Sequence, residues 1–160
     1  MIVASALTCR CCAQSRGYIY AGPVYGDDDL HESLCPWCIA DGSAASKLGA
    51  SFADSHPLLK AGIAPEIVDE VNLRTPSYIS WQQEEWLSHC NDACEFHGDA
   101  AIADVRDAAE QTKRLWIERY HQNEEGWIRA TKGYSPKGDS AFYKFVCRHC
   151  GEILLGWDLS

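Results

Sequence analysis

The sequence predicts an α+β fold in which a helical middle separates two small zinc-binding β-hairpin modules. Three observations indicate this class: two Cys-x-x-Cys pairs near the N-terminus, a third near the C-terminus, and helical periodicity between them. The chain has 160 residues and is 46% hydrophobic, which is enough for a packed core. We expect an N-terminal zinc-knuckle module over residues 1–50. Residues 51–160 should form a helical region that is closed by a C-terminal zinc-ribbon hairpin. We expect the whole chain to form one compact unit.

The N-terminal module should contain a short β hairpin followed by a short helix. Residues 17–25 are rich in strand-forming types and are interrupted by Gly22-Pro23, which predicts the hairpin. Residues 39–48 favour a helix that ends at Gly49. The polar stretch from residue 51 to residue 62 predicts a connection.

The middle of the chain should be helical. A first helix should begin at Pro65 and stop at Thr75-Pro76. Residues 79–90 should form a second helix, and residues 99–120 a longer helical pattern interrupted near Gln111. The second helix is expected to bury its tryptophans and expose its glutamates: Trp81, Trp86, Glu84 and Glu85.

The C-terminal segment predicts a zinc-ribbon hairpin. Residues 142–146 alternate like a strand, and residues 153–159 read as the returning strand. Between them lies Cys147-Arg-His-Cys-Gly151, in which Gly151 supplies the positive φ that the turn requires.

Two Cys-x-x-Cys turns near the N-terminus predict one structural zinc site. Such a turn directs two sulfurs at one tetrahedral centre, so two turns complete a closed site. The predicted ligands are Cys9, Cys12, Cys35 and Cys38. A redox pair at Cys35-Pro-Trp-Cys38 is the alternative, but it leaves the first turn unexplained and no βαβ pattern surrounds it. Cys11 is an alternative ligand in place of a neighbouring cysteine, but we expect it to point away as an extra thiol.

A second zinc site is predicted from the four remaining cysteines. Cys90 and Cys94 are four residues apart, so on a helix they share one face and can meet Cys147 and Cys150. Rival ligands stay open: His89, His97 and His149. The sequence therefore predicts two structural zinc ions, and two closed sites leave no open position for activating water. No other catalytic constellation stands out, so we do not expect an enzyme.

Composition restricts the classes of partner and compartment. The formal net charge is −9, which argues against direct nucleic-acid binding and favours a basic partner. The odd number of cysteines, nine, suits metal thiolates in a reducing cytoplasm better than a disulfide framework. We expect no secretory leader and no membrane span, because no apolar run approaches the roughly 18 residues that a span requires.

Several motifs around the cysteines occur together in a known family. They are Arg16-Gly-Tyr-Ile-Tyr-Ala-Gly-Pro-Val-Tyr25, Leu34-Cys-Pro-Trp-Cys38, Arg74-Thr-Pro-Ser-Tyr78, Trp86-Leu-Ser-His-Cys-Asn-Asp-Ala-Cys94 and Phe145-Val-Cys-Arg-His-Cys150. In these motifs the chain closely resembles the CbrC family, from about Cys9 to the C-terminus. That family is named for a bacterial protein linked to tolerance of an E-type colicin, which is a nuclease bacteriocin.

The resemblance and the acidic composition together predict a zinc-binding immunity protein that neutralises a basic nuclease toxin. The acidic residues expected to contact the toxin are Asp27, Asp28, Asp29 and Glu32, with Glu84 and Glu85 as the alternative face. A zinc-ribbon adaptor or regulator that binds protein or nucleic acid is the main competing function. A zinc-dependent or thiol enzyme is the third.

Overall fold

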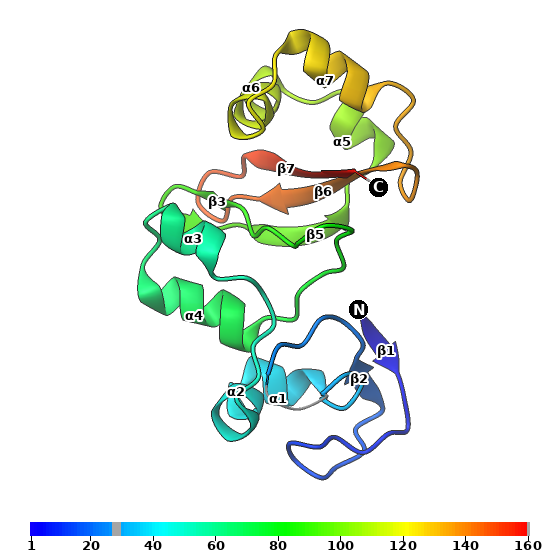
Figure 1. Ribbon diagram of the computed structural model, residues 1–160, viewed down its shortest axis with the longest axis vertical. Helices are drawn as coiled ribbons and strands as arrows, with labels where there is room; N and C mark the ends of the chain where they lie inside the picture. The colour runs from blue at the N-terminus through cyan, green and yellow to red at the C-terminus, as the bar shows by residue number, and fades with distance from the viewer. Residues whose placement is uncertain (27–29, 160) are drawn as a thin grey trace. The chain divides into compact units, whose positions relative to one another are not determined.

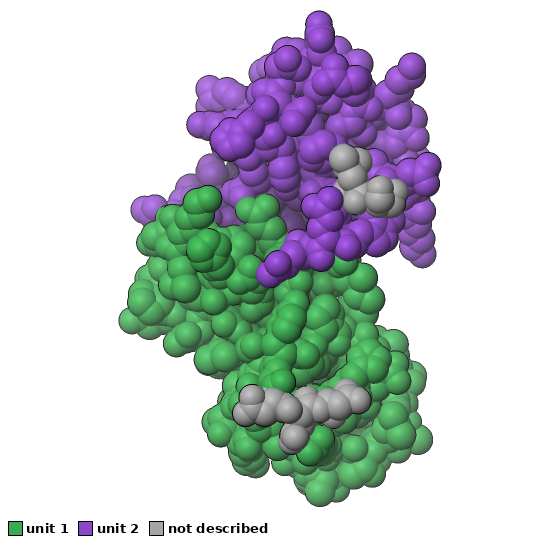
Figure 2. Space-filling view, in the orientation of Figure 1, with its two compact units in different colours: residues 1–80, 84–86 green, residues 81–83, 87–160 purple. Residues whose placement is uncertain are grey.

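A computed structural model describes residues 1–26 and 30–159 of the chain. The chain divides into two compact units (Figure 2). Unit 1 comprises residues 1–80 and 84–86, and unit 2 comprises residues 81–83 and 87–160. The predicted α+β class is confirmed, with small β hairpins at both ends. Residues 51–80 belong to unit 1 together with the N-terminal cysteines.

Unit 1 is a short two-stranded sheet followed by short helices (Figure 1). In chain order its elements are β1 (Ile2–Ala4), β2 (Tyr18–Tyr20), α1 (Pro36–Ala40), α2 (Ser43–Leu48), α3 (His56–Lys60) and α4 (Pro65–Arg74). Strands β1 and β2 are antiparallel, with Ile2 opposite Tyr20. The prediction that residues 17–25 form a hairpin by themselves is therefore wrong. Only residues 18–20 form a strand, and they pair with the start of the chain.

The helices of unit 1 begin and end where local backbone chemistry allows. Pro36 and Pro65 start α1 and α4, where a missing backbone N–H has no cost. The single helix expected over residues 39–48 is two helices, because Gly42 adopts φ 77° between them. Gly49 ends α2 with φ 63°, as predicted. Helix α3 lies in the stretch that was expected to be a plain connection.

The core of unit 1 forms around Tyr20. Its ring packs edge-on against Phe52 at 5.8 Å between ring centroids, and both side chains are fully buried. The Tyr20 hydroxyl donates to the carbonyl oxygen of Pro23 at 3.0 Å and accepts from the backbone N–H of Ser77 at 3.0 Å. The phenol thus joins β2 to a segment that is far away in sequence.

Unit 2 is a three-stranded antiparallel sheet with helices on one face (Figure 1). Its elements are β3 (Ser88–His89), β4 (Asp92–Ala93), β5 (Glu95–Asp99), α5 (Ile102–Arg106), α6 (Glu110–Arg119), α7 (Glu124–Thr131), β6 (Ser140–Val146) and β7 (Ile153–Leu159). The sheet order is β5-β6-β7, and β3 and β4 form a separate hairpin. The C-terminal hairpin was predicted, and the register Val146 opposite Ile153 places the Cys147–Gly151 turn at its tip.

The helix predicted over residues 79–90 is wrong. Residues 83–87 have no regular secondary structure, and the β3–β4 hairpin begins at residue 88. The backbone N–H groups of Trp81 and Gln82 donate to the carboxylate of Asp158 instead of to helical carbonyls. Trp81 is 46% exposed, whereas Trp86 is buried. A spacing of five residues separates two side chains by about 140° on a helix, so these tryptophans never shared a helical face.

The core of unit 2 forms around Trp116 on α6. Its indole ring contacts the rings of Tyr120, Trp127, Phe142 and Trp157 at centroid distances of 5.0–6.2 Å. The pattern expected over residues 99–120 is broken at residues 107–109, close to the interruption predicted near Gln111. None of the helices in residues 1–26 and 30–159 has both the length and the apolar character of a transmembrane segment.

Candidate metal centres

The first centre contains the four cysteines predicted near the N-terminus. Their sulfur atoms all lie within 4.8 Å of one another. Cys9 and Cys12 lie in the loop between β1 and β2, while Cys35 and Cys38 lie at the start of α1. The sulfurs of Cys12 and Cys35 are 3.9 Å apart, and the backbone N–H of Cys35 donates to the sulfur of Cys9 at 3.2 Å. We call this set the first centre.

Cys9 and Cys147 each lie in a backbone turn of the same type. The Cys9 N–H donates to the Gln14 carbonyl at 2.9 Å, and the Ala13 N–H donates to the Cys9 carbonyl at 2.8 Å. The turn at Cys147 repeats both bonds, to Glu152 and from Gly151, at 2.9 and 3.0 Å. We call each of these a knuckle turn. Its fifth residue has positive φ, 56° at Ala13 and 73° at Gly151.

Knuckle turns favour the thiolate form of their first cysteine. Burial raises the pKa of Cys9, but hydrogen bonds from backbone N–H groups, beginning with that of Cys35, outweigh it and lower the pKa to about 7. At Cys147, burial again opposes the N–H groups of Cys150 and His149, and the pKa falls to about 6. Burial is the largest cause that raises the pKa of Cys35 and Cys38. A dication in the first centre would offset the charge of the additional thiolates.

The second centre contains His89, Cys90, Cys147 and Cys150. Their ligand atoms lie within 4.8 Å of one another. The Nδ1 atom of His89 is 3.3 Å from the Cys90 sulfur and 3.4 Å from the Cys150 sulfur. Cys90 and Asn91 form the tip of the β3–β4 hairpin and both have positive φ, 52° and 58°. The second centre therefore joins the tips of two hairpins, β3–β4 and β6–β7.

Cys94, which was predicted as the fourth ligand, lies outside this cluster, and His89 takes its place. The prediction assumed a helix, on which residues 90 and 94 share a face, but residues 88–93 form a β hairpin and Cys94 is the single residue between β4 and β5. Cys94 is 3% exposed, and burial raises its pKa to about 12, as for a small apolar side chain. His89 was one of three histidines considered, and its position next to Cys90 was the available signal.

The other two histidines have different partners. His97 lies 3.5 Å from a Glu95 carboxylate oxygen. His149 lies within the second knuckle turn, and its Nε2 atom is 2.8 Å from Asp92. Arg148 donates to the other Asp92 oxygen at 2.6 Å. Asp92 is 8% exposed and belongs to β4, so its carboxylate connects the two hairpins that carry the second centre independently of any metal.

Cys11 does not belong to the first centre. Its thiol donates to the Ser43 hydroxyl at 3.4 Å, on the side of α2. This placement agrees with the expectation of an extra thiol. Cys11 is therefore a suitable control residue for the ligands beside it.

The acidic residues predicted to face a partner differ in their exposure. Asp27, Asp28 and Asp29 lie outside the described residues. Glu32 is exposed and Glu85 is half-buried. Glu84 was expected to face solvent but is only 5% exposed, and it accepts a hydrogen bond of 2.8 Å from the Tyr25 hydroxyl. Glu84 therefore contributes to the interior of unit 1 and not to an acidic surface.

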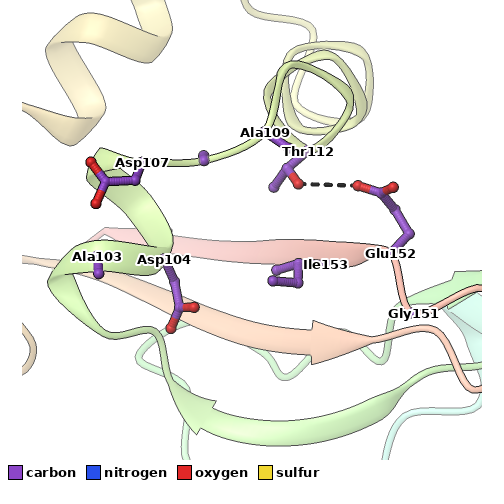
Figure 3. Close-up of a pocket in the computed structure, with 9 residues that line it drawn as sticks. Ala103, Asp104, Asp107, Ala109, Thr112, Gly151, Glu152 and Ile153 are labelled. Atoms are coloured by element: carbon purple, nitrogen blue, oxygen red, sulfur yellow. Dashed lines mark hydrogen bonds between the residues drawn. The ribbon is translucent and has the colours of Figure 1, made fainter.

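Away from the cysteines, a pocket of about 390 Å³ lies where α5, α6 and the start of β7 meet (Figure 3). Three carboxylates line it, and each has a partner in the chain. Asp104 binds Lys144, Asp107 binds Arg106, and Glu152 accepts from the Thr112 hydroxyl at 3.1 Å. Because each carboxylate is already paired with another side chain of the protein, the two cysteine centres are the stronger candidates for function.

Comparison with known proteins shows the family of the chain. The model of an uncharacterised protein family, UPF0167, matches residues 1–159. A UPF0167 protein of Pseudomonas aeruginosa is 48% identical over 152 residues, which cover 94% of this chain and 85% of the relative. UPF0167 proteins of Mycobacterium bovis and Mycobacterium tuberculosis are each 46% identical over 155 residues, covering 96% of this chain and 83% of the relative. No solved structure matches the chain.

These matches correct the resemblance to the CbrC family. The matching family model and the relatives at 46–48% identity carry the name UPF0167 and no colicin-related name. The function that the resemblance implied therefore loses that support. The chain belongs to the uncharacterised protein family UPF0167.

Proposed function

We propose that this protein binds two zinc ions, one in each centre, and uses them to hold its two units folded. The observation that carries the proposal is the presence of two groups of four sulfur or nitrogen ligands, each group within 4.8 Å. Thiolate and imidazole ligands in groups of four suit tetrahedral zinc. Four protein ligands fill the coordination shell, so neither ion would activate water. A binding role without catalysis follows.

In this role each ion would join two segments that are distant in the sequence. In the first centre, zinc would join the β1–β2 loop to α1, a helix of only five residues. In the second, it would join the tips of the β3–β4 and β6–β7 hairpins. Structural zinc contributes on the order of 10 kcal/mol in small modules, far more than any single hydrogen bond nearby.

Metal analysis of the purified protein tests the proposal. Zinc should be near two equivalents per chain, and a value near zero would refute it. Cys12→Ser should lose the zinc of the first centre and unfold the N-terminal segment. Cys11→Ser is the matched control, because its thiol lies beside the same turn without belonging to the centre. Equal loss in both variants would show that the ligands are assigned wrongly.

We further propose that the partner is a basic protein, and specifically a nuclease toxin that this protein neutralises. Charge supports this proposal: the formal net charge is −9. Zinc with four thiolates would add −2 and zinc with three thiolates and an imidazole would add −1, which brings the total to −12. Nuclease toxins carry basic clefts for phosphates, so an acidic protein would associate with them rapidly.

Co-expression with a candidate nuclease toxin tests this partner. The protein should restore survival and form a complex whose association slows with salt. The variant in which Asp27, Asp28 and Asp29 are all changed to Lys should associate more slowly. Glu84 is excluded from this test, because its burial makes any change there a stability experiment. Survival without a complex would contradict direct neutralisation and favour a regulatory role.

A further inference from the structure

The two centres differ sharply in their exposure to solvent. In the first centre, Cys9 and Cys35 are fully buried, Cys38 is 3% exposed and Cys12 is half-buried. In the second centre, Cys90 and Cys150 are exposed and only Cys147 is buried. A solvent oxidant must reach a sulfur atom to react with it, so access favours reaction at the second centre.

The two exposed sulfurs are also close to each other. The Sγ atoms of Cys90 and Cys150 are 3.8 Å apart, and a disulfide bond needs about 2.05 Å. Cys90 lies at the tip of a two-residue turn between β3 and β4, with Asn91 as the other turn residue. A hairpin tip can move by the remaining distance without disturbing the sheet of unit 2. The first centre has a similar sulfur distance, 3.9 Å, so access and not distance separates the two centres.

We propose that Cys90 and Cys150 form a reversible oxidation site for hydroperoxides, and that their oxidation releases the second zinc ion. This inference rests on the zinc ions proposed above. In the first step a thiolate sulfur attacks one peroxide oxygen, which gives a sulfenic acid, and the hydroxide that leaves takes up a proton. In the second step the other thiolate attacks the sulfenic sulfur and displaces hydroxide, which also takes up a proton.

The step is balanced in atoms and electrons. Two thiolates lose two electrons and form one S–S bond, while hydrogen peroxide takes up two electrons and two protons and becomes two waters. Zinc then retains only His89 and Cys147 and dissociates, since two ligands do not hold it tightly. A thiol reductant restores both thiolates, and the ion can bind again.

After oxidation, the disulfide and the contacts of Asp92 should take over from the ion in joining the two hairpins of the second centre. Asp92 bonds to Arg148 at 2.6 Å and to His149 at 2.8 Å, which joins the β3–β4 hairpin to the knuckle turn without metal. The new disulfide would add a covalent link between the same two segments. Release would therefore change the charge and surface of this region without unfolding unit 2.

Peroxide treatment of the zinc-loaded full-length protein tests the proposal. Zinc content before treatment reports the proposed function, and the fraction released by hydrogen peroxide into a chromogenic chelator reports this inference. We expect about one of the two equivalents to be released about tenfold faster than the other, because thiol oxidation follows access. Mass spectrometry should map a Cys90–Cys150 disulfide, and dithiothreitol with zinc should reverse both changes. Release of both ions at one rate, or a disulfide elsewhere, would overturn the proposal.

Two variants make the test specific. Cys150→His keeps four nitrogen or sulfur ligands but removes the disulfide partner, so peroxide should release its zinc about tenfold more slowly than in the wild type. If Cys150→His releases zinc as fast as the wild type, the proposal is wrong. If this variant binds no zinc, the location of the disulfide in the oxidised wild type tests the proposal instead. Cys94→Ser, at a buried cysteine outside the centre, should respond as the wild type does. Loss of release in Cys94→Ser would assign the disulfide to Cys94 and refute the pair.

Discussion

The fifth residue of each knuckle turn offers a sharp test of the local geometry. The turns at Cys9 and Cys147 make the same two backbone hydrogen bonds, but one has Ala13 and the other Gly151 at the position with positive φ. An L-residue in the left-handed region costs about 1–2 kcal/mol, whereas glycine adopts it freely. We therefore predict that Gly151→Ala destabilises the protein and that Ala13→Gly stabilises it.

The magnitude can be worked from the structure. A Cβ atom at Gly151 would meet nothing within 4 Å, so no clash adds to the conformational cost. Alanine also restricts the unfolded chain, which returns about 0.4–1 kcal/mol. The net destabilisation by Gly151→Ala should be about 0.5–1 kcal/mol, with a gain of similar size for Ala13→Gly. If the turn forms only when zinc binds, the same energy should appear as a change of about two- to fivefold in zinc affinity.

Urea unfolding of the zinc-loaded variants measures the free energies, and competition with a chelator measures the affinities. The double variant should lie close to the wild type, because the two turns belong to different units and their effects should add. A neutral or stabilising Gly151→Ala would refute the argument that positive φ limits this turn. A destabilising Ala13→Gly would show that the Ala13 side chain contributes contacts that outweigh its backbone strain.

Three further predictions follow from particular contacts. In metal analysis, His89→Ala should bind one zinc ion fewer than the wild type, while Cys94→Ser should still bind two. The reverse result would show that Cys94, as expected from the sequence, is the fourth ligand. Tyr25→Phe should destabilise unit 1 by about 1–3 kcal/mol in urea unfolding, because it leaves the buried Glu84 carboxylate without the hydroxyl that donates to it. A change below about 0.5 kcal/mol would contradict a stabilising role for this hydrogen bond. Asp104→Asn should cost about 1–2 kcal/mol, because it breaks the 2.7 Å pair with Lys144. Burial raises the pKa of Asp104 and the hydrogen bond from Lys144 lowers it, and the net effect is a lowered pKa. The stabilisation from this pair is therefore fully present above the ordinary Asp pKa, and it is lost only as the pH falls through the lowered pKa of the folded protein. The difference between wild type and Asp104→Asn should therefore be constant from pH 8 to about pH 5, and fading within that range would contradict the lowered pKa.

The acidic surface shows how sequence reasoning about exposure can fail. Glu84 and Glu85 were assigned to the wet side of a helix, and the helix does not form. A charged residue is seldom buried unless it has a partner, and here the Tyr25 hydroxyl, 59 residues away, supplies one. Nothing near Glu84 in the sequence identifies that donor. Placing a buried carboxylate therefore required the packing of unit 1.

The predictions that the structure confirmed depend on interactions between residues that are close in the sequence. Helix α4 begins at Pro65, and the C-terminal hairpin turns at Cys147–Gly151. Both features depend on residues within about six positions of one another: a proline at a helix start, or a turn closed by its own backbone hydrogen bonds. The pairing of Cys9 and Cys12 with Cys35 and Cys38 also follows from turns that already direct two sulfurs the same way.

Only the tertiary structure decided between His89 and Cys94 as the fourth member of the second centre. The side chains of residues 89, 90 and 94 point in different directions on a helix and on a hairpin, and the sequence favoured the helix. The hairpin forms because Cys90 and Asn91 adopt positive φ at its tip and Asp92 binds Arg148 and His149 from the distant knuckle turn. The sequence by itself therefore determined the knuckle turns, while long-range contacts determined which ligand completes the second centre.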